Sequence, residues 1–151
     1  MAREFRTSPD FKAPVLANSA SGTSGQVLIS QGSVNPPQWG AVPVRANVAG
    51  ATSGTLTPNG NTTDLFEAEG LTGAITLAAP SGTPADGQKL LIRIKDNGTA
   101  RGITWTTSSG GYRAIGITLP TTTVISKVTY VGCIYNATDL FWDAVATVTQ
   151  A

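Results

Sequence analysis

Three carboxylates close together are the strongest candidates for chemistry in this chain. They are Asp64, Glu67 and Glu69, in the segment Asp-Leu-Phe-Glu-Ala-Glu. On a strand, Glu67 and Glu69 would point to the same face about 7 Å apart. That spacing suits a general acid/base pair or a Ca²⁺ site, but Asp64 is one residue out of phase. We therefore expect a polar face at a sheet edge and keep a glycan hydrolase using Glu67 and Glu69 as the weakest alternative.

Other catalytic arrangements lack the residues that they need. The chain contains no histidine, which removes Ser-His-Asp and Cys-His sites and the commonest ligand of transition metals. The glycine-bearing segment 108–111 is not followed by the Lys-Ser/Thr of a phosphate-binding loop. Cys133, the single cysteine, lies in an apolar run and is predicted to be a small buried residue. We predict no catalytic residue, no metal site, no cofactor and no enzymatic activity.

Aromatic side chains offer a binding site of another kind, because exposed rings can stack on sugars. Tyr112 follows Gly110 and Gly111 and is the best candidate on a loop. Trp105 shares a predicted strand face with Ile103, which favours a place in the core. Trp105 and Tyr112 together form the possible ligand loop.

Charge gives no indication of a nucleic-acid or membrane partner. Ten Lys and Arg against nine Asp and Glu leave a net charge of +1 over 151 residues, so there is no basic footprint for nucleic acid. No run of about 18 apolar residues predicts a membrane span. The first residues lack the apolar core of a signal peptide, so we expect the protein to be made, and to stay folded, in a reducing cytosol.

From about residue 46 the pattern becomes one of short strands between turn residues, without helical periodicity. The strands predicted are Thr55–Thr57, Asn61–Ala68, Ala74–Leu77, Gln88–Lys95, Ile103–Thr106, Ala114–Leu119, Lys127–Tyr135 and Phe141–Val148. We predict an all-β protein in which residues 46–151 form an antiparallel β-sandwich or jelly-roll-like domain. Strand 127–135 is apolar on both faces, which predicts a central strand covered on both sides. It should form a hairpin with strand 141–148.

The first 45 residues are organised differently. Residues 1–20 carry the isolated aromatics Phe5 and Phe11 without any periodicity, which indicates an extended arm that docks on a partner. Residues 21–45 form a linker in which 26–30 is a short extended segment, and its prolines disfavour a helix. So short an apolar segment cannot build a core, and it must lie against another surface.

Two segments resemble structural proteins of tailed bacteriophage virions. Residues 22–40 carry Gly-Thr-Ser-Gly-Gln-Val-Leu and then Pro-Pro-Gln-Trp-Gly, which is similar to an element of phage tail fibres and other virion appendages. Residues 86–105 and 130–143 resemble small β-structured proteins of head-decoration and fibre contexts. The resemblance implies a homotrimer. The chain has no long repetitive shaft and no large receptor-binding tip, which favours a protein attached to the head.

The sequence thus predicts a capsid decoration (cement or head-fibre) protein, located on the virion surface and made in the bacterial host cytoplasm. Its partners would be the major capsid protein, or a tail or baseplate protein, and its own copies. The residues expected to anchor it to the capsid are Arg3, Phe5, Arg6, Phe11 and Lys12. Those expected at the subunit interface are Val27, Leu28, Ile29 and Trp39. The alternative is a short tail fibre, or a receptor- or carbohydrate-binding protein of the tail.

Overall fold

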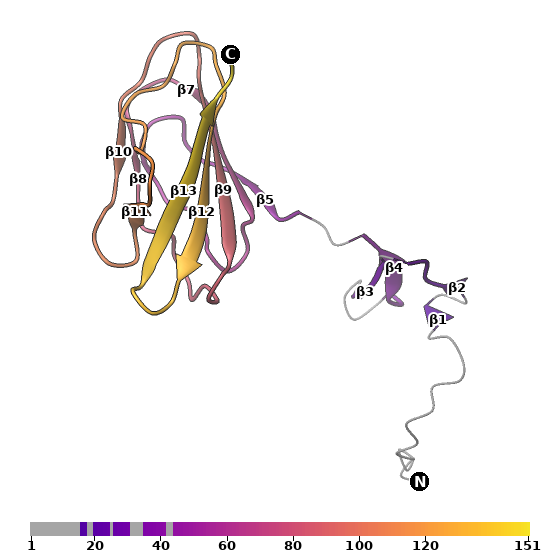
Figure 1. The fold of residues 1–151 in the computed structure, drawn as a ribbon. Helices are drawn as coiled ribbons and strands as arrows, with labels where there is room; N and C mark the ends of the chain where they lie inside the picture. Colours follow the sequence, from indigo (N-terminus) through magenta and orange to yellow (C-terminus); the bar gives the residue numbers. More distant parts are fainter. Residues whose placement is uncertain (1–15, 18–19, 25, 31–34, 42–43) are drawn as a thin grey trace. The chain divides into compact units, whose positions relative to one another are not determined.

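The chain divides into two compact units, Met1–Pro43 and Val44–Ala151. The structure, a computed structural model, describes residues 16–17, 20–24, 26–30, 35–41 and 44–151 (Figure 1). The boundary after Pro43 lies close to the predicted one at residue 45.

The first unit contains two small antiparallel pairs. β1 (Leu16–Ala17) pairs with β2 (Ala20–Ser21), and β3 (Val27–Ile29) pairs with β4 (Gln38–Gly40). The predicted extended segment 26–30 is therefore confirmed as strand β3. Its partner β4 was not predicted, because Pro36 and Pro37 precede it directly and the strand itself is only three residues long.

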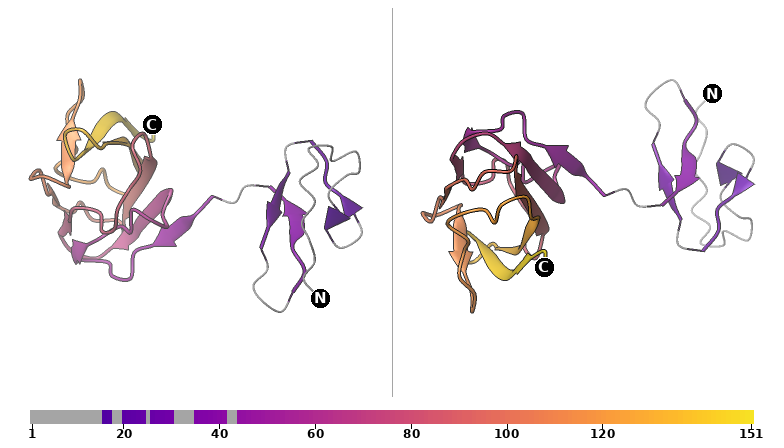
Figure 2. Two further views of the ribbon diagram at one scale, coloured as in Figure 1. Left: turned by 90° about the horizontal axis from the view of Figure 1, so that it is seen from below. Right: turned by 90° about the horizontal axis from the view of Figure 1, so that it is seen from above.

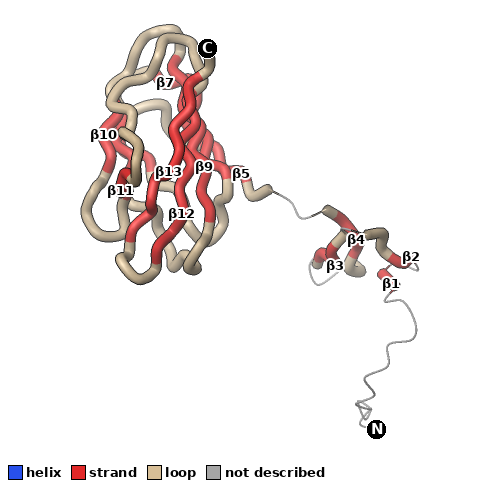
Figure 3. The backbone as a smooth tube through the Cα atoms, in the orientation of Figure 1, coloured by secondary structure: helices blue, strands red, loops and turns tan. Residues whose placement is uncertain are grey.

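The second unit is built from strands and loops, and no helix occurs among the residues described (Figure 3). Its strands are β5 (Ala46–Val48), β6 (Gly54–Leu56), β7 (Leu65–Leu71), β8 (Ile75–Leu77), β9 (Lys89–Asp96), β10 (Ile103–Trp105), β11 (Tyr112–Ala114), β12 (Thr129–Asn136) and β13 (Phe141–Thr149). The prediction of an all-β protein is confirmed.

In the described part of the chain, no helix is long and apolar enough to cross a membrane.

The strands of this unit form a six-stranded and a three-stranded sheet. The large sheet has the order β11-β13-β12-β9-β7-β5 and the small sheet the order β10-β8-β6. From β5 to β10 the chain alternates between the two sheets. Seen nearly end-on in Figure 2, the strands surround one interior.

The alternation between sheets makes many of the strand pairs parallel. β5, β7 and β9 pair in parallel in the large sheet, and so do β6, β8 and β10 in the small one. Antiparallel pairing within this unit is found for β9–β12 and for the predicted hairpin β12–β13. The prediction of antiparallel sheets is therefore wrong, and the parallel pairs depart from a jelly roll. The alternating pattern of a short strand indicates which face is buried but not which neighbour it pairs with.

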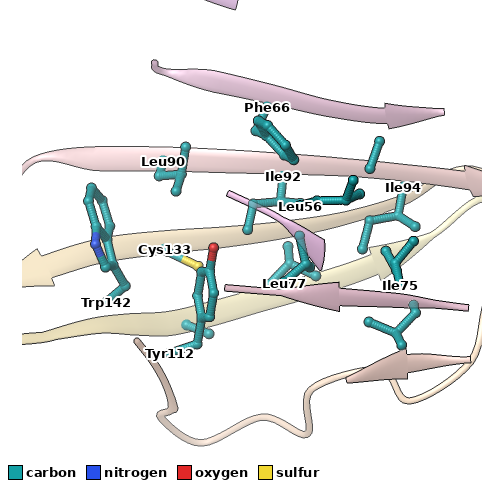
Figure 4. Packing of buried hydrophobic residues seen from close by; sticks show 14 of the residues in the cluster. Leu56, Phe66, Ile75, Leu77, Leu90, Ile92, Ile94, Tyr112, Cys133 and Trp142 are labelled. Atoms are coloured by element: carbon teal, nitrogen blue, oxygen red, sulfur yellow. The ribbon is translucent and has the colours of Figure 1, made fainter. Parts of the chain in front are cut away.

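The core lies between the two sheets (Figure 4). β9 shows how the sequence builds it, because Leu90, Ile92 and Ile94 point inward and are 1% exposed or less. The opposing layer is supplied by the small sheet. Its buried side chains are Leu56, Ile75, Leu77 and Ile103.

β11 is shifted from the predicted strand 114–119. It spans Tyr112–Ala114 and pairs in parallel with β13. Gly116 follows this strand with a φ of +68°, a left-handed conformation that glycine adopts readily and that changes the direction of the chain. Ile117 and Leu119 still pack against the core, from a loop rather than a strand. The predicted strand is therefore wrong beyond Ala114.

Asp96, at the end of β9, connects two loops. Its buried carboxylate accepts hydrogen bonds from Thr123 Oγ1 at 2.6 Å and from the backbone N–H groups of Ser126 and Gly98, both at 2.9 Å. The bond from Thr123 is the main cause that lowers the pKa of Asp96 below its ordinary value. The carboxylate thereby holds the long β11–β12 connection against the β9–β10 loop.

Candidate interaction surfaces

The β3–β4 hairpin carries all four residues that the sequence placed at a subunit interface. Leu28 pairs with Trp39, so these two side chains share one face, while Val27 and Ile29 lie on the other. Val27 is 39% exposed and Leu28 is 45% exposed. Strands this short cannot bury apolar side chains on both faces of a two-stranded pair. The hairpin therefore presents an apolar surface, and its role as a subunit interface stays a prediction.

Two glycines determine how the hairpin packs. A Cβ atom at position 22 would lie 2.6 Å from the indole ring of Trp39, so the ring rests directly on the Gly22 backbone. A Cβ atom at position 40 would likewise lie 2.8 Å from Cδ1 of Ile29. The turn before β3 is fixed by bonds from Thr23 N to Gln26 Oε1 at 2.8 Å and from Gln26 N to Thr23 O at 3.1 Å. Close packing on glycine backbone orders the aromatic and aliphatic side chains without a core.

The predicted capsid-anchoring residues Arg3, Phe5, Arg6, Phe11 and Lys12 lie outside the described residues.

A second apolar surface lies on the outer face of the large sheet, beside the charged side chains of Glu67, Glu69 and Arg93. Its exposed side chains are Tyr130 (37%), Ile134 (38%), Leu91 (39%), Val145 (43%) and Val148 (64%). Gly132 lies among them, and the missing side chain leaves an open, mostly apolar hollow of about 290 Å³ that Leu91, Ile134 and Val145 also line. We call these residues the outer apolar face.

The outer apolar face corrects one expectation from the sequence. The strand over residues 127–135 was predicted to be covered on both sides, but only its inward residues, such as Val131 and Cys133, are buried. The pattern correctly showed two apolar faces. It could not show that the outer face has no cover within the described part of the chain. Sequence analysis missed this face, although the apolar Leu91 between Leu90 and Ile92 was a signal for it.

The candidate carboxylates Glu67 and Glu69 both contact one guanidinium group. Arg93 Nη2 lies 2.9 Å from Glu67 Oε2, and Arg93 Nε lies 2.8 Å from Glu69 Oε1. A hydrogen bond with Tyr130, followed by the charges of these two carboxylates, raises the pKa of Arg93. Asp64 forms a separate ion pair with Arg45 at 2.5 Å. The three carboxylates thus form three ion pairs with two arginines on the sheet surface. The predicted polar face is confirmed, but its place at a sheet edge is wrong, because β7 lies between β5 and β9.

Arg113 organises the turn between β12 and β13. Its Nε donates to Asp143 Oδ1 at 2.7 Å, its Nη2 donates to Asp139 Oδ2 at 2.9 Å, and its guanidinium lies 5.0 Å from the centre of the Phe141 ring. The bond from Arg113 is the main cause that lowers the pKa of Asp143. These two ion pairs attach β11 to the β12–β13 hairpin.

The possible ligand loop is not a surface in this structure. Tyr112 is 0% exposed and meets Trp105 edge to face, with ring centres 4.9 Å apart. Trp105 is only partly buried, and its indole N–H donates to the carbonyl of Pro120 at 2.7 Å. The expectation that Tyr112 is an exposed stacking platform is wrong, because its ring fills the space between the sheets. Trp105, which was predicted to lie in the core, packs against the core cluster without being fully buried.

Cys133 is buried and free, as predicted. Burial raises the pKa of its thiol to about 12, with a smaller contribution from the charge of Asp143. Within the described ranges, no group of three or more Cys, Asp or Glu side chains could hold a metal ion.

Comparisons with protein-family models, with curated proteins and with solved structures found no match.

Proposed function

We propose that the chain is a structural protein of a bacteriophage virion that decorates and stabilises the outside of the capsid as a homotrimer. The observation that carries the proposal is the β3–β4 hairpin, whose sequence resembles an element of virion appendages. It displays apolar side chains on both faces, packed on Gly22 and Gly40. A partner surface must cover such an element.

The proposal divides the work between the two units. The N-terminal arm attaches the protein to the major capsid protein through Arg3, Phe5, Arg6, Phe11 and Lys12. The hairpin packs between subunits through Val27, Leu28, Ile29 and Trp39. The sandwich-like β domain is the body displayed on the virion, and its buried core supports this role because the body needs no partner to fold.

The proposed mechanism is mechanical. A protein that bridges neighbouring capsomers adds interface area, and this area must be separated before the shell can rupture under the pressure of the genome. Apolar anchors in partner pockets supply most of the free energy of such a contact, and charged residues at its rim add specificity. No catalytic group is required.

The second candidate is a short tail fibre, or a receptor- or carbohydrate-binding protein of the tail, whose partner is a tail or baseplate protein. The hairpin element favours it as well, because tail fibres carry a similar element. The burial of Tyr112 removes the ring best placed for sugar stacking, which weakens this candidate relative to decoration.

Immunogold labelling of virions tests the proposal. Antibodies raised against the β domain should label the heads of intact particles at many positions. Label confined to the tail would support the second candidate and overturn decoration. Virions without label, prepared beside a labelled preparation of the isolated protein, would overturn both.

A further inference from the structure

The last strand of the β domain has an open edge along its second half. β12 pairs with β13 along its whole length, from Phe141 to Thr149. On the other side, β11 pairs only with Trp142, Asp143 and Ala144. Residues 145–149 are all exposed, and no described residue pairs with them on this side (Figure 1).

The structure shows why the pairing stops at Ala144. The last bond across this edge runs from Ile115 N to Ala144 O at 2.9 Å, and Gly116 then turns the chain away. The same segment next joins the small sheet, where Ile103 N donates to Thr121 O at 2.8 Å. A β-bulge opposite Gly132 and Cys133 adds an extra residue to β13 at this point.

In the open stretch, the backbone N–H and C=O groups of two threonines point away from β12. Gln150 N donates to Val128 O at 2.8 Å, so Gln150 and Val128 form a hydrogen-bonded antiparallel pair. Because such pairs alternate along a ladder, Thr147 and Thr149 direct their N–H and C=O groups away from β12. These groups are a template for another strand.

The side chains of this stretch contain nothing that would prevent another strand from pairing with it. Residues 145–150 read Val-Ala-Thr-Val-Thr-Gln, with no charge, proline or glycine. Edge strands of natural proteins are normally kept short or are protected by charges, proline or bulges. The other edge strands, β5, β6, β10 and β11, are three residues long, and β11 carries the charged Arg113. Residues 146–149 of β13, which follow the bulge at Val145, carry no charge or proline of their own.

We propose that this edge pairs with the same edge of a second copy, in antiparallel fashion around Thr147. An uncharged strand meets its own copy without opposing like charges, which would destabilise a cross-strand pair. Thr147 would exchange two backbone hydrogen bonds with Thr147 of the other copy, and Ala146 would face Val148. The contact is two-fold and joins two large sheets into one.

The pairing also extends the outer apolar face. Val148 and Tyr130 are directly opposite each other in the β12–β13 ladder, and both are exposed. In the pair, the Val148 side chains of both copies lie on the same face of one continuous sheet. The inference concerns only the β domain and does not depend on what the N-terminal arm binds. If the hairpin makes trimers, the edge contact links one trimer to the next.

Sedimentation velocity of the full chain over a dilution series tests this inference. The wild type should show an association step that doubles the particle mass. Thr147→Pro removes an edge N–H without removing a donor to β12 and should raise the dissociation constant of that step about tenfold or more. Thr147→Val keeps the N–H and should leave the step unchanged.

A second pair of variants keeps the test decisive if the proline variant misfolds. Val148→Lys places like charges near the two-fold axis and should also weaken the doubling. Val124→Lys changes a similarly exposed valine of the β11–β12 connection and should not weaken it. The proposal is overturned if the wild type shows no doubling step, or if Val148→Lys doubles like the wild type. Hydrogen exchange at Thr147 and Thr149 should slow as protein concentration rises, and rates independent of concentration would equally contradict it.

Discussion

The two units of this protein use apolar residues in opposite ways. In the β domain, strands from two sheets bury sixteen hydrophobic residues in one cluster. In the hairpin, Val27 and Leu28 remain largely exposed, and none of the described residues between 22 and 41 is buried. The side chains are similar in kind, but only the domain has enough strands to enclose them. The domain thus has a core of its own, whereas the described part of the hairpin unit has none.

From this difference we expect core residues to stabilise the fold and hairpin residues to contribute to association. A core side chain contacts many neighbours in its own chain, so its loss is measured in the free energy of unfolding. A hairpin side chain has few such contacts, so its loss should appear in association.

The largest effect is expected in the core. Phe66 on β7 is 2% exposed, and Phe66→Ala should lower the free energy of unfolding by about 3–5 kcal/mol because a cavity remains. Leu28→Ala on the hairpin should change it by about 0.5 kcal/mol or less. Urea denaturation followed by tryptophan fluorescence compares the two. A similar loss in both variants would mean that the hairpin belongs to the folding unit.

An acid-sensitive effect is expected at Asp96. Because the folded state lowers the pKa of this carboxyl from 3.8, its ionised form stabilises the fold above that value. This contribution is lost as the pH falls below 3.8 towards the folded pKa. Asp96→Asn should therefore lower the melting temperature at pH 7 and flatten its decrease under acid conditions. Thr123→Val removes the main hydrogen-bond donor and should move the acid transition to higher pH. If the decrease in melting temperature under acid conditions is unchanged in both variants, the assignment of this decrease to Asp96 is contradicted.

A glycine substitution should affect binding without affecting the domain. In Gly22→Ala, the new methyl group would occupy the position of the Trp39 ring, so the hairpin surface must rearrange. We expect weaker association of subunits and an unchanged melting temperature of the β domain. Gly50→Ala is the matched control, because a Cβ atom there has no neighbour within 4 Å. Equal association of the two variants in light scattering would argue against a role for the hairpin surface.

The smallest change is expected at Cys133. With its thiol buried and its pKa raised to about 12, it should not react with a disulfide reagent at pH 8 in the folded protein. It should react fully in urea. Rapid reaction of the native protein would show that the core opens near Gly132, where the outer face is hollow.

Sequence reasoning predicted the β domain well where periodicity carried the information. The inward residues Leu90, Ile92 and Ile94 and the β12–β13 hairpin follow from alternation and a short connection. The parallel pairs could not be predicted, because pairing depends on which strands the chain brings together. β5 was missed because three residues are too few to show a pattern.

The candidate sites were predicted less well. The four interface residues do come together on one hairpin, since they lie close in sequence around a single turn region. Tyr112 was misassigned because glycines before an aromatic residue suggested an exposed loop. Gly111 instead lies where any Cβ atom would collide with the carbonyl oxygen of Thr106, and the side chain of Tyr112 lies in the core. Close backbone contacts of this kind leave no signal in residue type alone.

Attachment to capsids tests the central division of labour most directly. Full-length protein and a variant lacking residues 1–20 would be mixed with undecorated capsids and sedimented. We predict that the variant keeps the circular dichroism and melting temperature of the β domain but no longer sediments with capsids, while the full chain does. Undiminished sedimentation of the folded variant with capsids would contradict attachment through the N-terminal arm.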